Sequence, residues 1–277
     1  MHSTLPRRDF LTRVAKIAGG SAAALVVLPL LEPNYAQARQ VSPDDRHLHT
    51  ESFEFMGPNG KVRGYLAHPN KLARGQKLPA ILVIHETGGL NEHIEDVVRR
   101  AGLAGFFAVA PDGLSSAGGT PADPEAARDL FARTDPARIA SDILAIVPWL
   151  DAHPLCDGKI GSVGFDYGGG MALRSAIDVK GVDAVVAFYG KQLTAEETRR
   201  LEVPVMLHYA GNDESIDAGI ADFRAALESR HVSYEIYVYP GTEHGFHNDA
   251  NGARYDKVAA KLAWTRSVDF LNHNLKG

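Results

Sequence analysis

The stretch 160–176, IGSVGFDYGGGMALRSA, constrains the fold more than any other part of this 277-residue chain. It starts as an apolar run typical of a buried strand, passes through a glycine-rich turn, and continues with the pattern of a helix. Gly164 and Gly168 have no Cβ, so the strand and the helix can approach closely on either side of Asp166. The sequence therefore predicts a tight strand-to-helix turn that exposes the Asp166 side chain at the edge of a sheet.

The remaining pattern predicts a single α/β domain. An antiparallel hairpin is expected first, and strands then alternate with helices. Strands are predicted at 53–57, 62–69, 78–86, 106–112, 159–165, 182–190, 203–211 and 233–241. Helices are predicted at 92–105, 137–153, 168–177, 216–230 and 253–272, with a loop at 113–124. This order favours an α/β-hydrolase type of fold, a mostly parallel, twisted sheet with helices on both faces and sites at the carboxyl ends of its strands.

The N-terminal segment has the order of an export signal. A twin-arginine pair lies at 7–8, an apolar run follows at 17–31, and AQA at 36–38 offers a cleavage site. We therefore expect a twin-arginine signal at 1–38, a mature domain at 39–277 and a periplasmic location. The alternative is a retained transmembrane anchor, but the run contains two glycines and a proline and is shorter than the roughly 20 residues that a span needs.

Charge and cysteine content argue against several classes of partner. The formal net charge is −5 and no basic stripe is present, so neither nucleic acid nor, after signal removal, a membrane surface is expected to bind. The single cysteine, Cys156, cannot form an internal disulfide and is expected to be a structural thiol. His244 and His247 lie beside Glu243 and Asp249, but no third set of ligands completes a metal site, so no metal is predicted.

Polar residues follow four of the predicted strands at the point where each strand ends. In chain order they are His85, Glu86 and Thr87, then Asp166, Asp213 and His244. The order of turn residue, acid and histidine is that of the catalytic triads of the α/β-hydrolase fold. In such a site His244 is the base and Asp213 orients its ring. The N-terminus of the helix after the turn stabilises an oxyanion together with the backbone N–H of Thr87.

Each of these residues also has an ordinary structural interpretation. Asp213 lies in GNDES, which is typical of a turn or a helix cap, and His244 alone is compatible with a surface histidine. His85 and His208 lie inside apolar strands and are interpreted as core residues or as supports of the site. The joint order, with each residue at a strand end, favours the hydrolase interpretation.

Four longer segments resemble the dienelactone hydrolase (carboxymethylenebutenolidase) family. They are VIHETGGLNEHIEDVVRRAGLAGFFAVAPD, GSVGFDYGGGMA, YAGNDESI and YPGTEHGFHND, and the resemblance runs from about residue 51 to the C-terminus. The family implies an α/β-hydrolase fold, hydrolysis of ester or lactone bonds in small-molecule substrates, and no cofactor. It also implies a cysteine nucleophile, with Asp213 as the acid and His244 as the base of the triad.

By the same resemblance, Glu86 contacts the nucleophile in the resting enzyme, and Thr87 and Tyr167 stabilise the oxyanion through their backbone N–H groups. The sequence departs from the family at two positions. Asp166 stands where the family has its nucleophilic cysteine, which bears on the mechanism. Asn248 stands where the dienelactone-specific members have an arginine that binds the substrate carboxylate, which bears on the substrate.

Asp166 leaves three hypotheses open. In the first it attacks carbon and forms an ester intermediate, as in the haloalkane dehalogenases and epoxide hydrolases. In the second, a slow esterase, His244 and Asp213 activate water directly, or Asp166 attacks an activated acyl group. The third is a hydrolytically inactive form that binds ligand, natural or engineered. If Glu86 and Asp166 are neighbours, their like charges predict that the pKa of one of them is raised.

Overall fold

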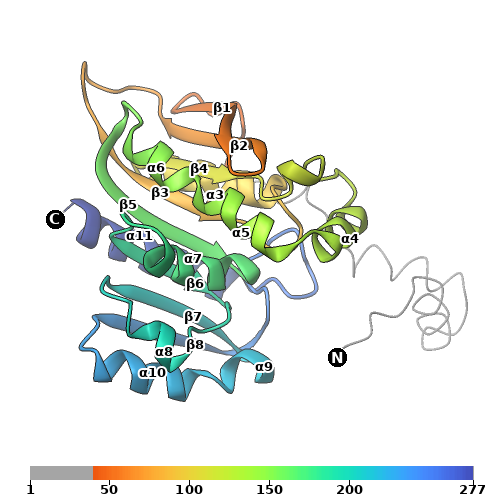
Figure 1. Cartoon of the computed structure of the whole chain (residues 1–277), viewed down its shortest axis with the longest axis vertical. Helices are drawn as coiled ribbons and strands as arrows, with labels where there is room; N and C mark the ends of the chain where they lie inside the picture. Colours follow the sequence, from red (N-terminus) through yellow and green to blue (C-terminus); the bar gives the residue numbers. More distant parts are fainter. Residues whose placement is uncertain (1–39, 277) are drawn as a thin grey trace, which may run out of the picture.

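The computed structural model describes residues 40–276, which form one eight-stranded sheet between two layers of helices (Figure 1). The strand order is β1-β2-β4-β3-β5-β6-β7-β8. The pairs β1–β2 and β2–β4 are antiparallel, and the other pairs are parallel. The strands are β1 (Leu48–Gly57), β2 (Gly60–Pro69), β3 (Leu78–Ile84), β4 (Phe107–Pro111), β5 (Cys156–Phe165), β6 (Ala184–Phe188), β7 (Val205–Asn212) and β8 (Tyr234–Glu243). The predicted mostly parallel α/β architecture is confirmed.

The predicted export signal at 1–38 lies outside the described residues, as do both end residues of the predicted domain, 39 and 277. The single sheet draws strands from most of the described part, from Leu48 to Glu243. Within 40–276, no helix combines the length and the apolar character needed to cross a membrane.

The central strands are buried, which explains their continuous apolar sequences. Every residue of β3, β4 and β6 is buried. The helices are α3 (Glu92–Leu103), α4 (Pro124–Arg133), α5 (Pro136–Leu144), α6 (Ile146–Asp151), α7 (Tyr167–Asp178), α8 (Ala195–Thr198), α9 (Glu214–Asp217), α10 (Ile220–Ser229) and α11 (Lys257–Lys276), with a 3-10 helix η2 (Ser115–Ala117). One apolar core lies under α3 and α11, and a second lies on the opposite face under α5, α6, α7 and α10.

Two predicted boundaries in the middle of the chain were wrong. The helix predicted at 137–153 is two helices, α5 and α6. Pro148 has no N–H to donate to the carbonyl of Leu144, and its ring crowds that carbonyl, which interrupts the helix at Ala145. The loop predicted at 113–124 contains η2, and its last residue begins α4, where the Asp123 side chain caps the helix.

The last helix begins at Lys257 rather than at residue 253. Asp256 sets this start, because its carboxylate accepts from the backbone N–H groups of Val258 at 3.0 Å and of Ala259 at 2.8 Å. The sequence analysis does not predict α4, α8 or α9. For α8 and α9 the reason is that a single turn of helix has no periodicity that could reveal it.

A buried ionic network joins α3 to the first described residues and to the segment after β8. Asp96 is fully buried, as is Arg99, and Arg100 is 7% exposed. Asp96 accepts from Nε of Arg100 at 2.7 Å and from the backbone N–H of Val41 at 2.8 Å. Arg100 also donates through Nη2 to Asp249 at 2.7 Å. Each charge is compensated by its neighbours, so the loss of one leaves the other buried charges with less opposite charge around them.

We predict that Asp96→Ala lowers the free energy of unfolding by about 3–5 kcal/mol, because it leaves two buried guanidinium groups undercompensated. The measurement is urea-induced unfolding at pH 7. The control is Lys61→Ala, which removes an exposed ion pair to Glu54 of similar length, 2.8 Å, and should change stability little. Equal effects of the two substitutions would contradict the structural importance of this network.

Candidate active site

The turn predicted around residue 166 is present between β5 and α7, with Asp166 at its tip. The φ of 51° and ψ of −115° at Asp166 lie in a region that L-residues rarely adopt, so the backbone is strained there. A Cβ on Gly164 would lie 1.8 Å from the carbonyl oxygen of Gly168, and one on Gly168 would lie 2.3 Å from that of Ile84. Only glycine fits at either position, and this close packing fixes the place of the Asp166 carboxylate.

His244 follows β8 and bridges two carboxylates. Its Nδ1 lies 2.5 Å from Oδ2 of Asp213, a buried residue directly after β7, and its Nε2 lies 3.2 Å from Oδ1 of Asp166. The hydroxyl of Ser215 donates to the other oxygen of Asp213 at 2.9 Å and so holds that carboxylate in place. Three polar residues from separate strand ends are therefore in direct contact.

The two carboxylates keep His244 protonated. Its partial burial acts to lower the pKa, but the hydrogen bonds and the charges of Asp166 and Asp213 together raise it to about 9. At neutral pH the ring is therefore an imidazolium between two negative charges, and both of its nitrogens donate. A neutral ring, which can take up a proton, becomes the major form only above about pH 9.

Glu86 lies in the loop after β3, and both of its carboxylate oxygens accept hydrogen bonds. Asn248 donates through Nδ2 to Oε2 at 2.9 Å, and the hydroxyl of Tyr189 donates to Oε1 at 3.4 Å. Burial raises the pKa of Glu86, the electrostatic influence of His93 opposes the rise, and the charge of Asp166 adds to it. The expected rise in one carboxylate pKa is confirmed, although burial contributes more to it than the neighbouring charge.

His85 and His208 are core residues, as their place in apolar strands predicts. His85 is fully buried; its Nε2 accepts from the backbone N–H of Gly113 at 3.0 Å, and its Nδ1 donates to the carbonyl of Glu86 at 2.7 Å. Burial lowers its pKa and keeps the ring neutral. His208 lies 2.9 Å from the hydroxyl of Tyr239, and burial lowers its pKa to about 3. His85 thus supports the site by tying the loop after β3 to the loop after β4.

Thr87 and Tyr167 both lie at the carboxyl edge of the sheet. Thr87 directly follows Glu86, and Tyr167 is the first residue of α7, directly after Asp166. The ring of Tyr167 packs edge-on against Phe131 with 4.9 Å between the centroids, and burial raises the pKa of its phenol to about 12. Backbone N–H groups in the first turn of a helix have no partner within the helix, so Tyr167 has a donor suited to an anion.

A pocket of about 410 Å³ lies beside Asp166. Apolar and polar side chains share its wall, among them Tyr167, Met171, Arg174, Gln192, Leu193 and Ile216. Arg174 is engaged in ion pairs with Glu197 and Asp178, each at 2.7 Å, so its charge is already balanced. The volume suits a small molecule rather than a polymer.

Tyr189 and the pocket residues after it are parts of the site that sequence reasoning missed. Tyr189 follows β6, is fully buried, has a positive φ of 38°, and contacts Glu86. Its position directly after a buried strand could have marked it as a site residue, but an aromatic residue at the end of an apolar run resembles a core residue.

Cys156 lies at the other end of β5 from Asp166, where burial raises the pKa of its thiol. Among residues 40–276, no group of three or more His, Cys, Asp or Glu side chains is arranged to hold a metal ion.

Comparison with known proteins places this chain in a family. A model of the Dienelactone hydrolase family matches residues 62–275. The chain is 48% identical to a provisionally named hydrolase fragment, YghX, of Escherichia coli (strain K12) over 115 residues, 41% of this chain and 97% of that protein. It is 32% identical to a provisionally named carboxymethylenebutenolidase of Synechocystis over 237 residues, 79% of this chain and 94% of that protein. The crystal structure of a provisionally named dienelactone hydrolase from Klebsiella pneumoniae covers 80% of this chain and 97% of its own, with a TM-score of 0.71 and 25% identity.

We predict that the ring of His244 titrates near pH 9 by NMR, and that Asp166→Asn lowers this value because one of the two carboxylates loses its charge. The folded-state pKa lies above the unfolded value of about 6.5, so this protonation stabilises the fold fully below about pH 6.5. The contribution is lost as the pH rises toward about 9. An unchanged titration in the variant would show that Asp166 does not hold the proton on His244.

Proposed function

The chain belongs to the dienelactone hydrolase family, and from this premise we propose that it hydrolyses ester or lactone bonds in small molecules at the pocket beside Asp166. The observation that carries the proposal is the hydrogen-bonded series Asp213–His244–Asp166, whose last member lines that pocket. No cofactor and no metal takes part in the proposed reaction.

In the proposed reaction a water molecule attacks the acyl carbon, and neutral His244 takes a proton from that water through Nε2. Asp213 orients the ring and stabilises the imidazolium that forms. The backbone N–H groups of Thr87 and Tyr167 donate to the oxyanion of the tetrahedral intermediate. When the intermediate collapses, the imidazolium gives the proton to the leaving alkoxide, and the acid and the alcohol are released.

Asp166 has a different role in this reaction from that of a cysteine at the same position. Attack of its carboxylate on an acyl carbon would give an anhydride, which is a high-energy intermediate. We instead assign Asp166 the role of holding His244 and its proton. The fraction of neutral His244 falls about tenfold for each pH unit below the pKa of about 9, so Asp166 makes the reaction slow at neutral pH.

A second candidate is hydrolysis through attack of Asp166 on a saturated carbon, which would give an alkyl ester that a water activated by His244 then opens. The observation that favours this second candidate is the position of Asp166 at the pocket and beside His244. The carboxylate lines the pocket, its side chain is 35% exposed, and it contacts the base that the second step needs. Substrates of this kind carry a leaving group such as a halide on the attacked carbon.

We also propose that the protein is exported by the twin-arginine route and acts in the periplasm as a mature domain that begins at residue 39. The proposal rests on the sequence of the first 38 residues, where a twin-arginine pair, an apolar run and a cleavage site follow one another.

The variant Asp166→Asn tests the proposed reaction. It keeps the shape of the side chain and removes its charge, so the pKa of His244 falls and more of the base is free at neutral pH. We expect the rise of kcat/KM with pH, centred near 9 in the parent, to move to lower pH. At pH 7 kcat/KM should increase about tenfold. The measurement is the pH–rate profile on a short-chain aryl ester and a lactone, with Asp213→Asn as a control that loses activity.

The same variant separates the alternatives. If Asp166 is the nucleophile, Asp166→Asn abolishes turnover of a haloacid, and a single turnover in ¹⁸O-labelled water places the label in the Asp166 carboxylate. If neither the parent nor Asp166→Asn hydrolyses any of these substrates, while Asp166→Cys hydrolyses esters, the parent is an inactive, ligand-binding form. Either result would overturn the water-attack proposal.

For export, we predict that the double substitution Arg7→Lys, Arg8→Lys keeps the protein in the cytoplasm, because the route requires the arginine pair. The measurement is cell fractionation, with the intact mass of the periplasmic protein reporting cleavage after Ala38. Arg13→Lys, outside the pair, is the control and should be exported normally. Uncleaved protein in the membrane fraction would favour a retained anchor.

A further inference from the structure

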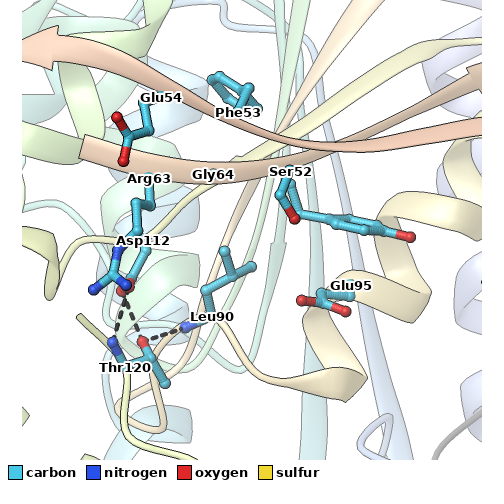
Figure 2. A pocket seen from close by; sticks show the side chains of 10 residues that line it. Ser52, Phe53, Glu54, Arg63, Gly64, Leu90, Glu95, Asp112 and Thr120 are labelled. Carbon is cyan, nitrogen blue, oxygen red and sulfur yellow. Dashed lines mark hydrogen bonds between the residues drawn. The ribbon is translucent and has the colours of Figure 1, made fainter. Parts of the chain in front are cut away.

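The loop that carries two of the proposed site residues is supported by a second loop. The first spans 85–91 after β3, the second spans 112–120 after β4, and they are termed the β3 loop and the β4 loop. Since β3 and β4 are parallel neighbours, the two loops leave the sheet at the same edge. Figure 2 shows Leu90, Asp112 and Thr120 where the two loops meet, on the wall of a pocket of about 400 Å³.

The hydroxyl of Thr120 is the link between the two loops. It donates to Oδ1 of Asp112 at 2.7 Å and accepts from the backbone N–H of Leu90 at 2.9 Å, and Figure 2 draws both bonds. Asp112 is 4% exposed and also accepts from the backbone N–H groups of Thr120 at 2.9 Å and of Leu114 at 3.0 Å. The bond to Asp112 fixes the direction of the Thr120 O–H. A lone pair of the Thr120 oxygen therefore points toward the backbone N–H of Leu90 in the β3 loop.

Gly89 lets the β3 loop come close enough for this contact. Its φ is +70°, and a Cβ at this position would lie 2.2 Å from Oγ1 of Thr120. The backbone N–H of Gly89 donates to the carbonyl of Glu86 at 3.1 Å, which closes a short turn with Thr87 inside it. Glu86 and Thr87 belong to this turn. A displacement of the Thr120 side chain is therefore expected to move the Glu86 carboxylate and the backbone N–H of Thr87.

The β4 loop is itself anchored to the sheet. The backbone N–H of Asp112 donates to the carbonyl of Arg63 on β2 at 2.7 Å, and the backbone N–H of Arg63 donates to the hydroxyl of Ser115 at 2.9 Å. The bond from Gly113 to His85 at 3.0 Å is a second link between the loops. The β4 loop is thus a fixed support against which the β3 loop rests.

We propose that Thr120 is a positioning residue for the ester or lactone hydrolysis proposed above. Its hydroxyl sets the β3 loop so that Glu86 and the N–H of Thr87 keep their places in the site. The catalytic part of this inference rests on the proposed function, while the positioning of the loop does not. Thr120 is not among the residues that line the pocket beside Asp166, so its effect must pass through the β3 loop.

The test compares Thr120→Val, which keeps the shape but loses the hydroxyl, with Thr120→Ser, which keeps the hydroxyl. The matched control is Thr50→Val on β1, which removes a single hydroxyl bond to the carbonyl of Pro43 at 3.2 Å. We expect Thr120→Val to lower kcat about tenfold with KM changed less than about twofold, because the substrate pocket is untouched. Amide hydrogen exchange over 86–91 should become about tenfold faster in this variant alone.

Three results would overturn the proposal. The first is unchanged amide exchange over 86–91 in Thr120→Val, and the second is a Thr120→Ser variant as defective as Thr120→Val. The third is faster exchange throughout the sheet in Thr120→Val, which would indicate a global loss of stability. An unchanged kcat with faster loop exchange would overturn the catalytic part. If the parent protein hydrolyses no ester or lactone, the proposed function fails. The exchange measurements then decide the positioning role by themselves, with local acceleration in Thr120→Val and rescue by Thr120→Ser in its favour.

Discussion

The site depends on one cation that two carboxylates share. His244 donates to Asp213 through one ring nitrogen and to Asp166 through the other, and each carboxylate is fixed independently of the ring. Burial and the Ser215 hydroxyl hold Asp213, and a strained turn between close-packed glycines holds Asp166. Because the ring lies between two fixed charges, its pKa is a property of the whole edge of the sheet rather than of His244 alone.

The parallel sheet is what brings these charges together. Asp166, Asp213 and His244 follow β5, β7 and β8, respectively. These three strands lie in the same half of the strand order, and β6 is the single strand between β5 and β7. The carboxyl ends of parallel strands meet at one edge, so residues 78 and 31 positions apart in the chain come into contact. The two apolar cores hold the strands, and this rigidity allows the backbone strain at Asp166 to persist.

The sequence predicts the parts of the site that follow a general rule. Glu86, Asp166, Asp213 and His244 are polar residues that follow predicted strands, and the fold places them together. Tyr189 and Thr120 carry no such signal, because an aromatic residue beside an apolar strand resembles core and a threonine in a glycine-rich loop resembles a turn former. Their contacts depend on the paths of the loops, which no periodicity encodes. The same limit applies to the pKa of Glu86, since like charge can be read from the sequence but burial, the larger cause, cannot.

A carboxylate at the turn changes what the histidine can do. A thiol beside an imidazole can give up its proton or keep it, so the pair exchanges charge during a reaction. A carboxylate has no such proton to exchange, and Asp166 instead lies 3.2 Å from Nε2 of His244. In the proposed reaction the rate therefore depends on the fraction of His244 that is neutral. A weaker contact between Asp166 and His244 increases that fraction.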